Sequence, residues 1–285
     1  MLASLLPVVI YLKRNKTMKT KNILLLVLIL STLFCVPTWA GSQANKQAVI
    51  EPQKIVKFAK DVEKYAAAKG ARAFIIARVG RPEKDLPKGI QYTHTAIAIY
   101  SNITLTNGET AQGYAIHNLY QLADQTNRSQ LIQDYPVDFF WGAQTLKAGI
   151  IIPTDEIQTR LIELIASGKN TDLHNPNYSV IANPMNSQLQ NCTEHTLDLI
   201  NAAIYQSTDI AKLKANARAH YTPQRVRTSR FKLMFGSWLM DDVTTKDHQG
   251  KIFTATFGSI HKYLEQYQLA KHSVTLNADG QTSIL

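Results

Sequence analysis

Cysteine is scarce in this sequence, which limits the kinds of site the chain can build. The 285 residues include two cysteines, Cys35 and Cys192. Cys35 lies in a leader-like segment, so a mature chain keeps Cys192 alone and cannot form an internal disulfide. A lone cysteine in an exported protein indicates a free and reactive thiol, because a thiol without a function is exposed to oxidation in an oxidising compartment.

Acidic residues are absent from the first 40 positions, which carry five basic residues. Two lysines precede the apolar run 23–34, and Ala40 ends a cleavage site of the small-residue type, a pattern typical of a secretory signal. The apolar run is shorter than the about 20 residues of a membrane-spanning helix. We therefore expect residues 1–40 to be an N-terminal extension (1–17) and a cleavable signal peptide. The expected location is the periplasm, with no stable membrane span after cleavage.

A strong excess of charge is also lacking once the leader is removed. The formal net charge of +10 falls to +5 without the five basic leader residues. This mild positive net charge predicts no nucleic-acid partner and suits binding to an anionic cell-envelope polymer. The basic run within 218–232 is interpreted as a solvated loop. The sequence carries no sign of an oligomeric state.

Repeats, low-complexity tracts and long linkers are missing as well. Residues 41–285 are therefore predicted to form a single domain, with a C-terminal extension from about residue 206. The hydrophobic periods predict an α+β fold, a small antiparallel sheet with packed helices. Helices are expected over 51–70, 154–168, 192–206, 235–240 and 260–272. Strands are expected over 71–80, 92–101, 114–120, 148–153 and 273–280, with a hairpin turn at Asn107-Gly108.

Cys192 begins one of the predicted helices, in "QNCTEHTLDLI". A thiolate is favoured at a helix N-terminus and beside a histidine, so this position suits a nucleophile. His94 is the best candidate for the base, because it opens the strand "HTAIAIY" and can point into a cleft at the strand's end. A third polar residue on the next strand must orient the imidazole. "YAIHNLY" offers His117 or Asn118, and only one of them can face His94, since side chains alternate along a strand.

These motifs resemble the circularly permuted branch of the papain-like NlpC superfamily, which includes lecithin retinol acyltransferase and its relatives. "QNCTEHTLDLI" is similar to the Asn-Cys-Glu-His helix start of that branch, with Thr193 as an insertion. His94 precedes Cys192 in the chain, which is the order of the permuted members. The mature chain also resembles an uncharacterised domain family of exported bacterial proteins. The resemblance implies a permuted papain-like fold, with Cys192 as nucleophile, His94 as base and His117 as the orienting residue.

Other interpretations of the same residues stay open. Cys192 and His195 are three apart and share a helix face, so with His94 and His117 they could hold a zinc ion, although no second ligand pair accompanies them. Taken singly, Cys192 reads as a small buried residue and His195 as a first-turn surface residue.

The sequence thus predicts a thiol hydrolase that cleaves an amide bond, with peptidoglycan peptides as the expected substrate class and no cofactor. The alternatives are an acyltransferase or lipid-ester hydrolase acting on an acyl substrate, and a non-catalytic module of the cell envelope.

Overall fold

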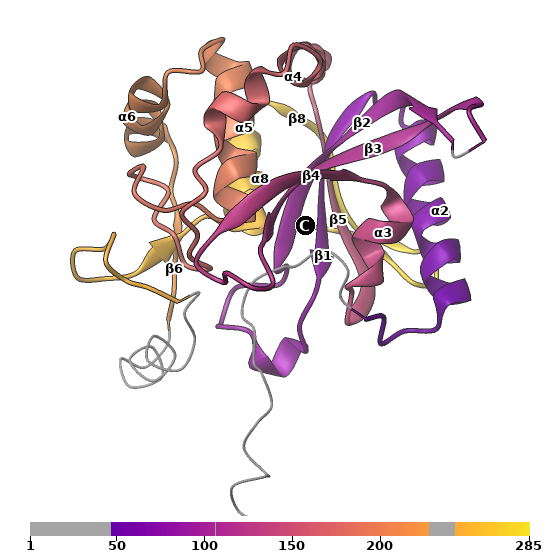
Figure 1. The fold of residues 1–285 in the computed structure, drawn as a ribbon, viewed down its shortest axis with the longest axis horizontal. Helices are drawn as coiled ribbons and strands as arrows, with labels where there is room; N and C mark the ends of the chain where they lie inside the picture. The colour runs from indigo at the N-terminus through magenta and orange to yellow at the C-terminus, as the bar shows by residue number, and fades with distance from the viewer. Residues whose placement is uncertain (1–46, 106, 228–242) are drawn as a thin grey trace, which may run out of the picture. The chain divides into compact units, whose positions relative to one another are not determined.

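The computed structural model describes residues 47–105, 107–227 and 243–285. Its main feature is a seven-stranded sheet in which every neighbouring pair is antiparallel, in the order β4-β3-β2-β1-β5-β8-β9 (Figure 1). The strands are β1 (Ala73–Val79), β2 (His94–Thr104), β3 (Thr110–Gln121), β4 (Ser129–Asp134), β5 (Thr145–Pro153), β8 (Ala270–Asn277) and β9 (Thr282–Ile284). A separate short ladder joins β6 (Gln224–Arg225) to β7 (Phe253–Thr254).

Helices cover both faces of the sheet (Figure 1). The described α-helices are α2 (Pro52–Ala68), α3 (Pro136–Trp141), α4 (Asp155–Ala166), α5 (Cys192–Tyr205), α6 (Ile210–His220) and α8 (Phe257–Gln266), with 3-10 turns at Glu83–Asp85 and Lys169–Leu173. One core cluster joins α2 and α3 to one face of the sheet, and a second joins α4, α5, α6 and α8 to the other. Strand β1 is buried along its whole length because it lies between these two layers, which explains its nearly continuous apolar sequence.

The α+β prediction is confirmed, but the sheet is larger than expected. Strand β4 and helices α3 and α6 were not predicted from the sequence. β4 reads "SQLIQD" and α3 has six residues, so neither shows a long hydrophobic period. The predicted helix near 235–240 and the predicted signal peptide lie outside the described residues. Among the residues that are described, no helix is both long and apolar enough to cross a membrane.

The β2–β3 hairpin has one irregularity that matters for the site. Its ladder runs from the Thr104–Thr110 pair to the Ile97–His117 pair and no further, although β2 continues back to His94 and β3 continues to Gln121. The two strands therefore separate at the end where His94 lies. Helix α5 contacts both of them.

Candidate active site

Asn191 fixes the start of α5, the helix that carries Cys192. Its side-chain oxygen accepts a hydrogen bond from the backbone N–H of Glu194 at 2.9 Å, as an N-cap residue does. Its amide nitrogen donates to the carbonyl of Val180 and the hydroxyl of Thr254, at 3.0 and 3.1 Å. The cap thus ties the helix to two neighbouring segments, and Cys192 is the first helical residue.

Cys192 lies where β2 and β3 separate. Its sulfur is hydrogen-bonded by the backbone N–H of Thr95, on β2, and it packs against Leu119, on β3. The Thr95 amide is available because the ladder with β3 has already ended at Ile97. The hydroxyl of Thr193 lies 3.8 Å from the sulfur and 3.2 Å from the Thr95 hydroxyl. The separation of the two strands thus creates the space that the thiol occupies.

His94 forms a hydrogen-bonded pair with Asn118 across the same gap. The Nε2 atom of His94 and the Oδ1 atom of Asn118 are 2.9 Å apart. The amide of Asn118 is oriented by its nitrogen, which donates to the Ile116 carbonyl at 3.1 Å and to Asp134 Oδ1 at 2.6 Å. Since Oδ1 of Asn118 can only accept, Nε2 of His94 carries the proton and Nδ1 carries the lone pair. Nδ1 is buried and has no hydrogen-bond partner in the described part of the chain.

Asp134 and Tyr120 extend this pair into a network. The hydroxyl of Tyr120 donates to Asp134 Oδ2 at 2.8 Å, and its ring stacks on the His94 imidazole with centroids 4.7 Å apart. Burial raises the pKa of Asp134 to about 7, against the opposing effects of Tyr120, Arg78 and Asn118. The aromatic ring of Phe139, on α3, lies 5.4 Å from His94 on another side. The imidazole is therefore held in a fixed orientation.

His117, the residue expected to orient His94, does not contact it in this structure. Antiparallel pairing places His117 opposite Ile97, whose side chain joins the core on the α5 face. Asn118, the next residue along, points to the α3 face, where the His94 ring lies. Because side chains alternate along β3, only one of His117 and Asn118 can face His94, and in this structure it is Asn118.

The thiol and the imidazole are both uncharged in this environment. Burial raises the pKa of Cys192, an effect that the Thr95 and Thr193 hydrogen bonds only partly oppose. Burial and the charge of Arg78 hold the pKa of His94 well below its usual range. The sequence led us to expect a stabilised thiolate, and the 5% exposure of Cys192 explains the difference. The sulfur is hydrogen-bonded to the backbone N–H of Thr95, the residue after His94, and no hydrogen bond joins it to Nδ1 of His94.

His195 does not lie on the surface, as its first-turn position suggested. It is 3% exposed, it is hydrogen-bonded to the backbone of Leu173, and its ring lies 6.3 Å from that of His174. Burial lowers the pKa of His195 to about 3. Within residues 47–105, 107–227 and 243–285, no three His, Cys, Asp or Glu side chains gather closely enough to hold a metal ion.

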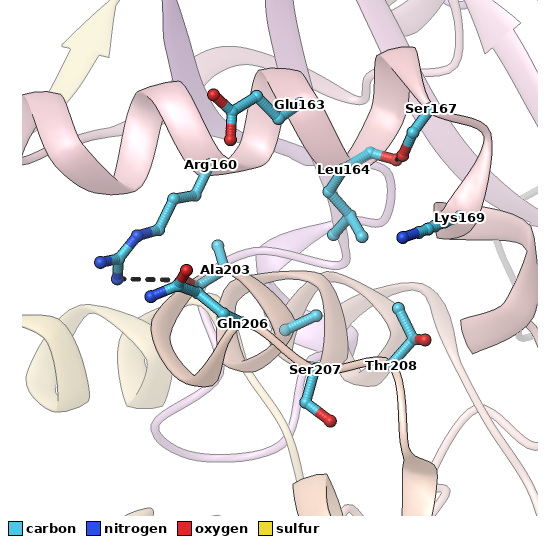
Figure 2. A pocket seen from close by; sticks show the side chains of 10 residues that line it. Arg160, Glu163, Leu164, Ser167, Lys169, Ala203, Gln206, Ser207 and Thr208 are labelled. Atoms are coloured by element: carbon cyan, nitrogen blue, oxygen red, sulfur yellow. Dashed lines mark hydrogen bonds between the residues drawn. The ribbon is translucent and has the colours of Figure 1, made fainter.

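A surface pocket lies at the opposite end of α5 from Cys192. It has a volume of about 400 Å³ and is lined by residues of α4, such as Arg160, and by the end of α5, where Ala203 and Gln206 lie (Figure 2). The guanidinium of Arg160 donates to the Ala203 carbonyl at 3.3 Å. No cysteine or histidine lines this pocket. A helix of 14 residues is about 21 Å long, so the pocket is remote from the thiol.

Sequence reasoning missed two charged residues of the site, Arg78 and Asp134. Arg78 is the one charged residue in the buried strand "AFIIARV", which is a usable signal, since charged side chains are seldom fully buried without a role. Asp134 ends β4, a strand that the hydrophobic pattern did not reveal.

The fold and the site define a three-layer α+β protein with a buried cysteine at a helix start, beside a histidine–asparagine pair. A family model described as "Uncharacterized protein conserved in bacteria (DUF2145)" matches residues 65–264, and the chain belongs to this family. No match exists among the curated proteins or among the solved structures.

Proposed function

We propose that the protein is an exported cysteine hydrolase of the permuted papain-like kind that cleaves an amide bond. Cys192 is the proposed nucleophile, His94 the base and Asn118 the residue that orients the base. The observation that carries the proposal is the hydrogen bond from His94 Nε2 to Asn118 Oδ1, which leaves the Nδ1 lone pair free, while the backbone N–H of the next residue, Thr95, holds the only thiol of the described chain.

The uncharged resting pair favours a general-base mechanism. The thiol proton moves to Nδ1 of His94 as the sulfur attacks the amide carbonyl carbon. The carbon–nitrogen bond then breaks, and Nδ1 gives the proton to the leaving amine. Water hydrolyses the resulting thioester, releases the acid and restores the thiol. Closing the contact between the sulfur and Nδ1 requires a local movement of either side chain, which is common when free active sites bind substrate.

The start of α5 supplies hydrogen-bond donors for the reaction. The backbone N–H of Cys192 belongs to the first helical residue and has no carbonyl partner within the helix. Such a group can bind the oxyanion that forms on the attacked carbonyl. Removal of one donor of this type typically lowers the rate about 100- to 1000-fold.

Peptidoglycan peptides are the proposed substrate class, and the periplasm the proposed location. The leader-like first 40 residues and the mild positive charge of the rest support both.

Digestion of purified peptidoglycan tests this function. Wild-type protein should release new amino and carboxyl groups from sacculi, and Cys192→Ser should release none, because a serine hydroxyl at this site lacks the acidity of a thiol. Gln206→Gly is the matched control, since Gln206 lies at the other end of α5 with a left-handed φ of 49° that glycine tolerates. Activity that persists in Cys192→Ser would reject Cys192 as the nucleophile.

Burial of the thiol favours a second candidate, a non-catalytic envelope module that uses the fold for binding. Cys192 is 5% exposed, as a structural cysteine would be. Wild-type protein that binds sacculi without cleaving them would support this candidate. Formation of a thioester on Cys192 with an activated acyl substrate would exclude it.

A further inference from the structure

Arg78 is a buried cation whose charge no described carboxylate neutralises directly. It is the next-to-last residue of β1, the central strand of the sheet, and is 3% exposed. No ion pair within 4.0 Å links it to an acidic residue of the described chain, in contrast to Lys214, the other buried cation, which pairs with Glu194 and Asp198. An unpaired buried charge is costly for stability, so it indicates a role.

The guanidinium of Arg78 is held by contacts on several sides. It donates a hydrogen bond to the backbone carbonyl of Phe139, and it lies 5.1 Å from the ring of Phe139 and 5.7 Å from that of Tyr120. Gly142 provides the space on the remaining side, because a Cβ atom there would come within 3.0–3.1 Å of three guanidinium atoms. The Nε atom has no partner among the described residues.

This fixed charge lies beside the proposed base, and the backbone N–H of Thr95, the next residue after that base, is hydrogen-bonded to the Cys192 sulfur. Arg78 is the direct cross-strand partner of His94 in the β1–β2 ladder, so both side chains point to the same face of the sheet. Tyr120 contacts both, with its ring stacked on His94 and facing the guanidinium. The nearby carboxyl group of Asp134 already accepts hydrogen bonds from Asn118 and Tyr120.

A positive charge at this place has opposite effects on the two partners. It lowers the pKa of His94 after burial has already done so, and it lowers the pKa of Cys192 against the stronger effect of burial. The other groups around the pair are Asn118, Tyr120 and Asp134, and of these Asp134 is the one that can carry a negative charge at neutral pH.

We propose that Arg78 is an electrostatic positioning residue, the fixed positive charge that keeps the resting His94 neutral and stabilises the negative charge that develops on the Cys192 sulfur as its proton moves to His94. The role rests on the proposed function of these two residues. It explains how a buried thiol can react without a resting thiolate–imidazolium pair. It also makes the transiently protonated His94 a stronger acid toward the leaving amine.

The alkylation rate of Cys192 by iodoacetamide tests the role without any substrate. The rate is measured between pH 7.5 and 9.5, where it follows the thiolate fraction. Arg78→Met should lower the rate at each pH by roughly tenfold, which corresponds to a thiol pKa about one unit higher. Arg78→Lys, which keeps the charge, should stay within about threefold of wild type.

Gly142→Ala provides a second variant that keeps the arginine. Its Cβ would lie 3.0–3.1 Å from the guanidinium, which must shift by a few tenths of an ångström, so a smaller decrease in the rate is expected. A purely structural role for Arg78 predicts the reverse, because a loosened core exposes the thiol and speeds alkylation.

Unchanged or faster alkylation in both Arg78→Met and Gly142→Ala would overturn the proposal. If Arg78→Met does not fold, unchanged or faster alkylation in Gly142→Ala alone would overturn the proposal. A slower Arg78→Met in a protein that never cleaves sacculi would uphold the electrostatic role and reject the hydrolase. Cleavage of sacculi by wild type, together with unchanged alkylation in the variants, would uphold the hydrolase and reject the electrostatic role of Arg78.

Discussion

Replacement of Asn118 by alanine, compared with the same change at His117, is the sharpest test of the site. The two residues are neighbours on β3 and face opposite sides of the sheet. Asn118 is 1% exposed and joins His94 to Asp134, whereas His117 is half-buried and makes no side-chain hydrogen bond to the described residues. The two variants should therefore behave very differently.

Asn118→Ala leaves the buried Nε2 of His94 and the partly buried Oδ1 of Asp134 without their partner. A buried polar atom without a partner costs about 1–3 kcal/mol and a partly buried one less, so the free energy of unfolding should fall by roughly 1–5 kcal/mol. In a domain of this size, each kcal/mol lowers the melting temperature by about 2–4 °C. His117→Ala should cost less than about 1 kcal/mol, as changes at partly exposed sites usually do.

Three measurements check this prediction. Thermal unfolding gives the stabilities, and nitrogen NMR of the His94 ring gives the tautomer, which should be protonated at Nε2 in wild type and in His117→Ala and mixed in Asn118→Ala. Digestion of sacculi should fall about 100-fold or more in Asn118→Ala, the usual contribution of a positioned base. Equal losses in both variants, or a greater loss in His117→Ala, would refute the assignment of the orienting residue to Asn118.

Three further predictions concern buried ionisable groups. Alkylation of wild-type Cys192 at pH 7 should be slower than that of an exposed thiol and should rise steeply above pH 9, because burial raises its pKa; a fast reaction at pH 7 would contradict this. Burial raises the pKa of Asp134 from 3.8 to about 7, so the folded state holds a proton that the unfolded state releases, and stability should fall as the pH rises from 4 to 7. Denaturant unfolding of Asp134→Asn should show a weaker fall over this range, and an identical pH dependence would exclude the effect. Lys214→Met should lower the free energy of unfolding by about 3–5 kcal/mol, because Glu194 and Asp198 lose their buried partner, and the added changes Glu194→Gln and Asp198→Asn should restore part of it. A variant Lys214→Met as stable as wild type would show that the ion pairs contribute little.

The sequence predicted the parts of the molecule that follow a regular hydrophobic period. Helices α2, α4 and α5 and the central strands were expected near their observed positions, whereas the helix expected over 260–272 is α8, which ends at Gln266, and residues 270–272 belong to β8. Short elements such as β4 were not expected, since six residues carry too little pattern. The position of Cys192 at a helix start was predicted as well, and the structure shows that Asn191 before it caps this helix.

Properties that depend on tertiary packing could not be predicted in this way. The choice between His117 and Asn118 depends on the register of β3, which a sequence with two adjacent polar residues leaves open. The raised pKa of Cys192 depends on how deeply α5 is buried, and its helix-start position alone suggested the reverse. The role proposed for Arg78 depends on its cross-strand neighbour His94, which lies 16 positions away in the chain.

The separation of β2 and β3 beyond the Ile97–His117 pair has a consequence for how the family can vary in length. The hairpin tip around Asn107 is exposed and lies far along the ladder from the thiol, so insertions there can be absorbed in the turn. Insertions or deletions within β3 cannot be absorbed in this way. A shift by a single residue would exchange the faces of His117 and Asn118 and would also turn Ile116 out of its core. Homologues should therefore differ freely in the number of tip residues, while the spacing from the core residues of β3 to the partner of the histidine stays constant.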